Sequence, residues 1–228
     1  MVLIFDKGNH SIEAFQAIDT LQLPFIASLR NSTQKDLLMI PDKDFTVMTL
    51  PSNGKEVRYY RTRRDIYGQS RTVYVLHDPR KKEKAMTIFT LKLQKRLLKM
   101  NKFLEKLNVK KWRSKEKVEA KLKKLAGKKP FVDVLSYTVT GSTGELKASV
   151  HIDEGAKKDY LVTLGRSIIF TSQDNWSPGM VIQAFRDKHV VEDTFKKLKN
   201  PHYLAIRPMY HWTDTCIRAH VFSCVLGL

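Results

Sequence analysis

Apolar residues recur at helical spacing over residues 83–107, and this pattern restricts the fold more than any other feature. Seven of them follow one another at steps of three and four, which places them along one side of a helix. They are Met86, Phe89, Leu93, Leu97, Met100, Leu104 and Leu107. An apolar seam of this length needs a partner surface, so the pattern predicts a long helix packed on a second helix.

The same part of the chain carries nearly all of the excess positive charge. The formal net charge is +18 over 228 residues, and residues 80–129 alone hold 20 Lys+Arg against 4 Asp+Glu. A second helix is expected after Ser114, with Val118, Leu122 and Leu125 as its apolar stripe and Gly127 at its end. The segment is therefore predicted to be a basic helical hairpin. Its counterpart is either a polyanion, most often nucleic acid, or the solvent around a Lys-rich surface.

The two ends of the chain show a different pattern, in which short apolar runs alternate with helical segments. Val2–Phe5 predicts a buried strand, Ile12–Leu21 a helix capped by Ser11, and the run PFIASL from Pro24 a second buried strand. Strand, helix and strand in this order are typical of an α/β unit. Ser167–Thr171 predicts a further central strand, and a long helix is expected from Pro178 to the Asn200-Pro201 pair.

Between these ends lies a long insertion of mixed character. Strands are expected at 57–60, 72–76, 131–140 and 145–152, with the basic hairpin at about 80–129 between them. The expected fold class is α+β, with a core formed by residues 1–44 and 166–228 and an insertion at 45–165. The last segment, 213–228, is predicted to be a buried helix.

Composition excludes several classes of protein. A hydrophobic fraction of 42% with 28% charged residues is typical of a globular chain rather than a disordered one. No run of 18 apolar residues predicts a transmembrane helix, and the start of the chain lacks the basic region of a signal peptide. Cys216 and Cys224 lie close together in one apolar segment, so we expect no disulfide framework and a cytoplasmic location.

Two carboxylates are candidates for chemistry. Asp6 stands at the end of the first predicted strand, where it is either a ligand or base, or a cap for the following loop. Glu192 lies in the predicted helix from Pro178, with Lys188, Lys196 and Lys199 at helical spacing from it. Those lysines are either a solvated helix face or a surface that holds phosphates. If the helix packs beside the strand, the two carboxylates could share Mg²⁺, which prefers oxygen ligands and substrate phosphate.

Four segments, in order, resemble the DDE transposases of insertion sequences. Phe185, Lys188, Glu192 and Lys199 match the spacing of the Y-(2)-R-(3)-E-(6)-K signature, with Phe in place of Tyr and Lys in place of Arg. The segments FDKGNHS (5–11), RSIIFTSQDNWSP (166–178) and RPMYHWTDTCIRAHVFSCVLGL (207–228) resemble other parts of the same family. Together the matching segments cover about a third of the chain.

The resemblance implies a ribonuclease-H-like core in which two aspartates and one glutamate bind two Mg²⁺ ions. Such enzymes hydrolyse one DNA strand at the end of the element, and the freed 3′-hydroxyl then attacks target DNA. By resemblance, Asp6 is the second aspartate and Glu192 the glutamate, while Lys188, Lys196, Lys199 and Phe185 contact DNA. Phe185 lacks a hydroxyl and Lys188 lacks the bidentate geometry of arginine, so both departures imply altered contact with the DNA end.

The first aspartate of the family has no counterpart in the sequence, because only five residues precede Asp6. We therefore expect the C-terminal part of a transposase, which does not catalyse by itself and whose sheet has unpaired edges. Its expected partners are DNA and either a second copy or a full-length transposase.

Two other functions remain open from the sequence. The chain could be a non-catalytic nucleic-acid binder or transposase inhibitor that works through residues 80–129, or a helical interaction module built on the Met86–Leu107 seam. Cys216 and His220 stand four apart, and we expect them to pack in a core rather than bind zinc. Tyr210 and Trp212 either stack on a base or pack the last helix onto the core.

Overall fold

The computed structural model describes residues 2–8, 10–50, 52, 54–200 and 210–226, without the side chains of residues 191, 195, 198, 199 and 225. Its helices are α1 (Ile12–Thr20), α2 (Pro79–Leu104), α3 (Lys115–Ala126), α4 (Phe131–Val134), α5 (Glu154–Thr163), α6 (Pro178–Lys199) and α7 (Asp214–Leu226). Its strands are β1 (Leu3–Phe5), β2 (Phe25–Leu29), β3 (Thr46–Thr49), β4 (Glu56–Ile66), β5 (Gln69–His77), β6 (Leu135–Thr140), β7 (Lys147–Ile152) and β8 (Arg166–Thr171). Short 3-10 segments are η1 (Asp36–Met39), η2 (Asp42–Asp44) and η3 (Lys110–Arg113). The fold is mixed α+β, which confirms the expected class at that level.

A six-stranded sheet forms the body of the molecule, in the order β1-β2-β8-β5-β4-β3. Strands β1 and β2 are parallel, and every other neighbouring pair in this sheet is antiparallel. Strand β8, more than a hundred residues after β2, lies between β2 and β5 and joins the two halves of the sheet. The central position expected for Ser167–Thr171 is therefore confirmed.

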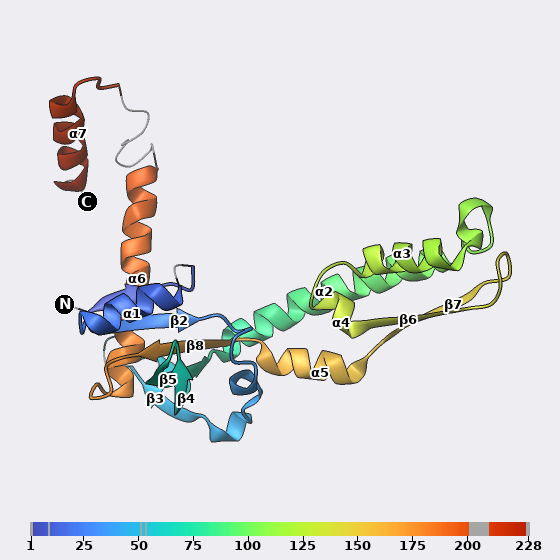
Figure 1. Cartoon of the computed structure of the whole chain (residues 1–228), viewed down its shortest axis with the longest axis horizontal. Coiled ribbons are helices and arrows are strands. Elements are labelled where there is room, and N and C mark those ends of the chain that lie inside the picture. Colours follow the sequence, from blue (N-terminus) through green and yellow to red (C-terminus); the bar gives the residue numbers. More distant parts are fainter. Residues whose placement is uncertain (1, 9, 51, 53, 201–209, 227–228) are drawn as a thin grey trace.

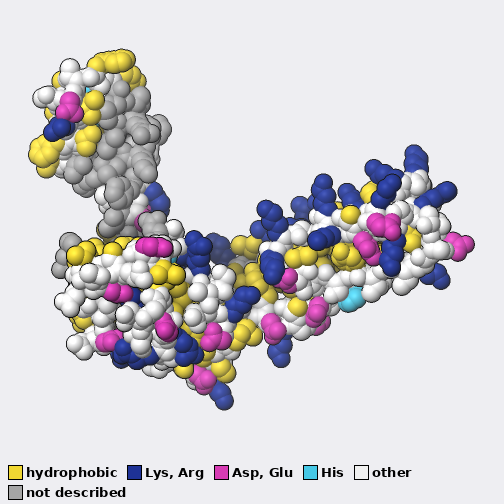
Figure 2. Space-filling view, viewed as in Figure 1, with side chains coloured by type: hydrophobic (Ala, Val, Ile, Leu, Met, Phe, Trp, Pro, Cys, Tyr) yellow, Lys and Arg dark blue, Asp and Glu magenta, His cyan; other side chains and the backbone are white. Residues whose placement is uncertain are grey.

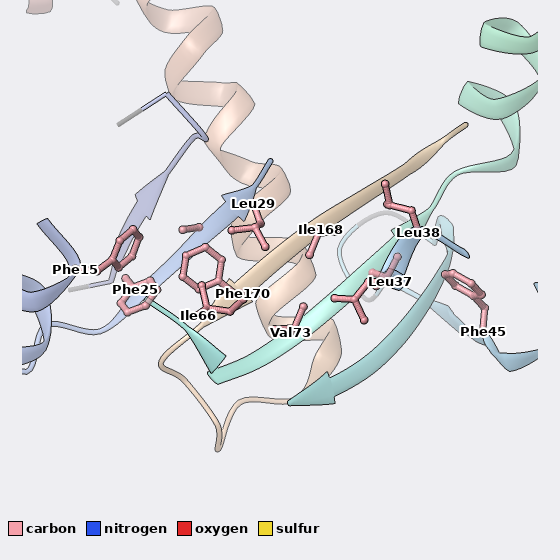
Figure 3. Close-up of a cluster of buried hydrophobic side chains, with 12 residues drawn as sticks. Phe15, Phe25, Leu29, Leu37, Leu38, Phe45, Ile66, Val73, Ile168 and Phe170 are labelled. Atoms are coloured by element: carbon pink, nitrogen blue, oxygen red, sulfur yellow. The ribbon is translucent and has the colours of Figure 1, made fainter. Parts of the chain in front are cut away.

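Each face of this sheet carries its own apolar cluster, because successive side chains of a strand point to opposite faces. Phe25, Ala27 and Leu29 of β2 point into a cluster with Phe15 of α1, shown in Figure 3. Ile26 points the other way, into a cluster that includes Val181 and Ile182 of α6 together with residues of β4, β5 and β8. Helices α1 and α6 thus cover opposite faces of the sheet (Figure 1).

Helices α2 to α5 and the β6-β7 hairpin extend from the body as an elongated arm (Figure 1). Its separate core contains buried side chains from α2, α3, α4 and the hairpin: Phe89, Leu93, Met100, Phe103, Val118, Leu122, Ala126, Val134, Leu135, Val139 and Leu146. The expected seam is therefore filled within the chain, except that Met86 stays 40% exposed. Because these side chains already pack within the arm, the seam is not available to bind a partner.

The arm joins the body where β5 runs into α2 and α5 runs into β8. At this root the backbone N–H of Asp78 donates to the carbonyl of Gly165 over 3.0 Å. The buried guanidinium of Arg166 donates to the carbonyls of Leu38 and Ile40, 2.6 Å each, and to the carboxylate of Asp42. The first contact joins the two segments of the root, and the contacts of Arg166 tie β8 to the η1–η2 loop.

The structure differs from the sequence-based expectations in four places. Strands β3, β4 and β5 belong to the central sheet, whereas the sequence placed residues 45–77 in the insertion; the arm begins at α2 instead. Residues Phe131–Val134 form the helical turn α4, and only β6 continues as a strand. Helix α5 was not expected. The C-terminal helix was predicted to be buried, yet most side chains described in α7 are exposed.

Candidate active site

Asp6 lies directly after β1, on the face of the sheet that α6 covers. The parallel register pairs Leu3 with Phe25 and Phe5 with Ala27, and both members of each pair point toward α1. Asp6 therefore points to the opposite face, as Ser28 of β2 does. The hydroxyl of Ser28 donates to Asp6 Oδ1 over 2.8 Å, and the backbone N–H of Lys7 donates to the same oxygen over 2.8 Å.

These contacts hold the carboxyl of Asp6 in its ionised form. The hydrogen bond from Ser28 is the largest cause, followed by that from the N–H of Lys7, and Lys188 adds a smaller attraction. Together they outweigh the partial burial of the group and lower the pKa of Asp6 from its ordinary value of 3.8 to about 2. The side chain still keeps 61% of its surface exposed, so a ligand can reach it.

Helix α6 brings Glu192 and Lys188 to Asp6 from the other end of the chain. Ser177 caps this helix and accepts from the backbone N–H of Met180, and Phe185 packs one turn before Lys188 against the α6-side cluster. The Lys188 ammonium lies 3.2 Å from Asp6 Oδ2 and 3.3 Å from Glu192 Oε1. It also stands 5.2 Å from the centre of the Phe185 ring.

The result is a cation shared by two carboxylates. Each acid keeps more than half of its surface exposed, whereas Lys188 keeps 22%. An oxygen pair that already converges on one positive charge matches what Mg²⁺ uses in proteins, one or two carboxylates with water and phosphate completing the shell. The two carboxylates therefore fit one divalent ion if the ammonium group of Lys188 moves away from them.

A third acid does not join this pair. Within residues 2–8, 10–50, 52, 54–200 and 210–226, no three His, Cys, Asp or Glu side chains gather as a metal site. Asp187 accepts from Gln183 over 2.6 Å, and Asp193 pairs with Lys196, so both neighbours of the site on α6 have other partners.

The predicted DNA-contacting residues of α6 fall into different surroundings. Lys188 lies in the candidate site, and Phe185 is partly buried under it as a packing residue. Lys196 is 74% exposed and lies 2.8 Å from Asp193, so it is not brought to Asp6. The side chain of Lys199 lies outside the described residues.

Sequence reasoning missed Ser28, the residue with the largest effect on Asp6. A signal was available, since Ser28 is the one polar residue in the otherwise apolar run FIASL of β2. A buried hydroxyl in such a strand requires a hydrogen-bond partner. Which partner it finds depends on the pairing of β1 with β2, which the sequence does not state.

The candidate residues near the C-terminus do not reach this site. Tyr210 is 79% exposed and Trp212 95% exposed, so neither packs the last helix onto the core. Cys216 is exposed, contrary to the expectation of core packing, while His220 lies 3.8 Å from the sulfur of Cys224. The expectation that Cys216 and His220 are core residues is therefore wrong for Cys216.

Comparison of the chain with models of protein families, with curated proteins and with solved structures found no match. No helix in the described part of the chain has the length and apolar character needed to cross a lipid bilayer.

Proposed function

We propose that this chain supplies two of the acids of a DDE-type transposase, which cuts the ends of a DNA element and joins them to target DNA. One observation carries the proposal: Asp6 and Glu192, 186 residues apart, converge on the same ammonium group. The resemblance of four segments to this family assigns both residues a catalytic role, and the ribonuclease-H-like core that it implies belongs to the same proposal.

In this function Asp6 and Glu192 would hold Mg²⁺ through their carboxylate oxygens. When bound, the ion polarises the phosphodiester and favours the attacking oxygen of water or of a 3′-hydroxyl. Ser28 and the N–H of Lys7 fix the orientation of Asp6 and keep it ionised. Lys188 binds a backbone phosphate next to the scissile bond once it leaves the two carboxylates.

With two carboxylates assembled, we expect the purified chain to bind a divalent ion weakly and not to nick DNA. The missing acid has to come from additional chain or from a second molecule. The proposal therefore includes another copy or a full-length transposase as a partner.

The test is Mn²⁺ binding by the full chain, followed by electron paramagnetic resonance. Asp6→Asn and Glu192→Gln should each weaken binding by at least tenfold, and Asp193→Asn should leave it unchanged. Asp193 is a matched control because it is an exposed carboxylate on the same helix, paired with Lys196 instead of Lys188. Equal effects of all three substitutions would contradict the assignment of Asp6 and Glu192. DNA nicking by this chain that Glu192→Gln abolishes would instead contradict the expectation that the chain does not catalyse by itself.

A second candidate function, binding of nucleic acid without catalysis, rests on the arm. Lys117, Lys121 and Lys124 lie on the outer side of α3 at steps of four and three, opposite the buried Leu122 and Ala126. Figure 2 shows Lys and Arg side chains crowded along one side of the arm. The described side chains of α3 include no large exposed hydrophobic, which suits a surface for phosphates. Salt-dependent binding of duplex DNA by the chain tests this function.

A further inference from the structure

The outward side of α2 differs from α3, because it exposes large apolar side chains among its lysines. Ile88 is 43% exposed, Leu91 62% and Leu98 56%. Three lysines alternate with them along the same side of the helix, since the positions follow at steps of four and three. The outward stripe consists of Lys84, Ile88, Leu91, Lys95, Leu98 and Lys102.

The opposite side of α2 already packs in the core of the arm. Phe89, Leu93 and Met100 are the buried residues there, about half a turn around the helix from Leu91. The outward stripe therefore contributes nothing to the arm's own core. Removing the exposed part of a leucine or isoleucine side chain from water is favourable, so this stripe gains from a partner.

The charges of the stripe restrict the partner. Within the described part of the chain, Lys84, Lys95 and Lys102 form no salt bridge, so their ammonium groups are available to acidic groups. Pairing with α2 of a second copy would place lysines against lysines, which is repulsive. A DNA backbone would satisfy the lysines, but it would leave Leu91 and Leu98 against phosphates, where their burial gains little.

We propose that this face of α2 docks an acidic amphipathic helix of another protein. Leucine-like residues of that helix would cover Ile88, Leu91 and Leu98, and its Glu or Asp residues would pair with the flanking lysines. From Ile88 to Leu98 the apolar positions span about 15 Å, or roughly three turns of such a helix. The proposal is independent of Asp6 and Glu192, and the helix binds on the arm rather than at the candidate active site.

The probe is a synthetic 21-residue helix with Leu at the a and d positions of each heptad, Glu at e and g, and Ala or Gln elsewhere. Its binding to the full chain is followed by fluorescence anisotropy. Leu91→Ser with Leu98→Ser should weaken binding at least tenfold while all lysines remain. Val109→Ser should leave it unchanged, because Val109 is a 53% exposed apolar residue of the same arm outside the stripe. Circular dichroism checks that each variant keeps its helices.

A charge reversal provides a second, positive readout. Lys95→Glu with Lys102→Glu should weaken binding of the Leu/Glu helix and create binding of a Leu/Lys helix of the same pattern. Duplex DNA and vesicles of phosphatidylcholine and phosphatidylserine are measured in parallel. The proposal is overturned if the Leu/Glu helix does not bind, if the serine variants bind it as before, or if those variants instead weaken binding of DNA or of the vesicles.

Discussion

The ionisation of Asp6 is governed by a serine rather than by the lysine nearest to it. Ser28 donates to Oδ1, whereas Lys188 contacts the other oxygen and contributes less to the lowered pKa. The hydroxyl of Ser28 is held in place by a buried strand, whereas solvent screening reduces the attraction of Lys188 at this partly exposed site. The site therefore depends on the pairing of β1 with β2 as much as on α6.

Substitution Ser28→Ala should raise the pKa of Asp6 from about 2 toward its ordinary value of 3.8. Lys188→Met should raise it by a smaller amount, because its contribution is smaller. The carboxyl resonance of Asp6, followed by NMR as a function of pH, measures both. A larger rise in the Lys188 variant than in the Ser28 variant would contradict the order of causes.

The sign of the pH dependence follows from the same shift. Since the pKa of Asp6 is lower in the folded chain, its interactions stabilise the fold fully above the ordinary value of 3.8 and are lost as the pH falls toward about 2. In the Ser28→Ala variant, the free energy of unfolding should therefore fall less between pH 5 and pH 2.5 than in the unsubstituted chain. Denaturant unfolding at the two pH values measures this difference.

In the proposed function, Lys188 would compete with a divalent ion for the same two carboxylates. Substitution Lys188→Ala should therefore strengthen Mn²⁺ binding, by about tenfold if removal of the positive charge changes the binding free energy by about 1.4 kcal/mol. Lys196→Ala removes the same charge from the same helix, but its ammonium group pairs with Asp193 and attracts Glu192 only as a minor contribution. Equal gains in the two variants would show a general charge effect instead of direct competition.

At the scale of elements, the sequence predicted those helices and strands that a local apolar pattern marks. Strands β1 and β2 were expected because each is a short apolar run, and α1, α2, α3 and α6 because their apolar positions repeat at about 3.6 residues. The membership of β3 to β5 in the central sheet was not, since it depends on pairing with β8 about a hundred residues away. Helix α5 has a weak apolar stripe, so its periodicity gave no signal.

The two sides of α2 should respond differently to the same substitution. Leu93 is buried in the arm core, so Leu93→Ala should lower the free energy of unfolding by about 2–5 kcal/mol. Leu91 is 62% exposed two residues earlier, so Leu91→Ala should change it by less than about 0.5 kcal/mol. Urea denaturation monitored by circular dichroism compares them. Similar losses would mean that the outward stripe also packs within the chain.

The root of the arm offers a second matched pair of substitutions. Gly165 and Gly68 both have positive φ, at +73° and +79°, where a side chain is strained. Gly68→Ala adds a methyl group to open space and should cost about 1–2 kcal/mol. Gly165→Ala would place the added carbon 2.6 Å from the carbonyl oxygen of Asp78, so the backbone at the root has to shift and the loss should be larger. Equal melting temperatures in the two variants would contradict this close approach.

At the scale of the whole molecule, the chain separates its two proposed activities in space. The acids lie beside the edge strand β1 and on α6. Most of the excess positive charge lies on the arm, along one side of which Figure 2 shows Lys and Arg side chains. The charge concentration in residues 80–129 was visible in the sequence. The sequence did not show that the outer side of α3, all of whose residues are described, exposes no large hydrophobic side chain, whereas that of α2 exposes three. That difference depends on which helix side packs against the β6-β7 hairpin, a non-local contact.

This separation gives a prediction for DNA binding by the whole chain. Lys117 and Lys124 are exposed on the outer side of α3, seven residues apart. Lys117→Gln with Lys124→Gln should weaken binding of duplex DNA and reduce the slope of log affinity against log salt by about 2, if each lysine contacts one phosphate. Filter binding at 50 to 200 mM salt measures the slope.

Lys35→Gln with Lys43→Gln is the matched control, since it removes the same charge from exposed positions in the body. A general attraction between the basic chain and DNA would change equally in both double variants. If DNA contacts the arm, only the α3 double variant should reduce the salt slope. Asp6→Asn should leave the slope unaltered, because phosphate binding on the arm does not involve the acids. An unchanged slope in the α3 variant would show that DNA does not bind this side of α3. That result would not affect the proposal for Asp6 and Glu192.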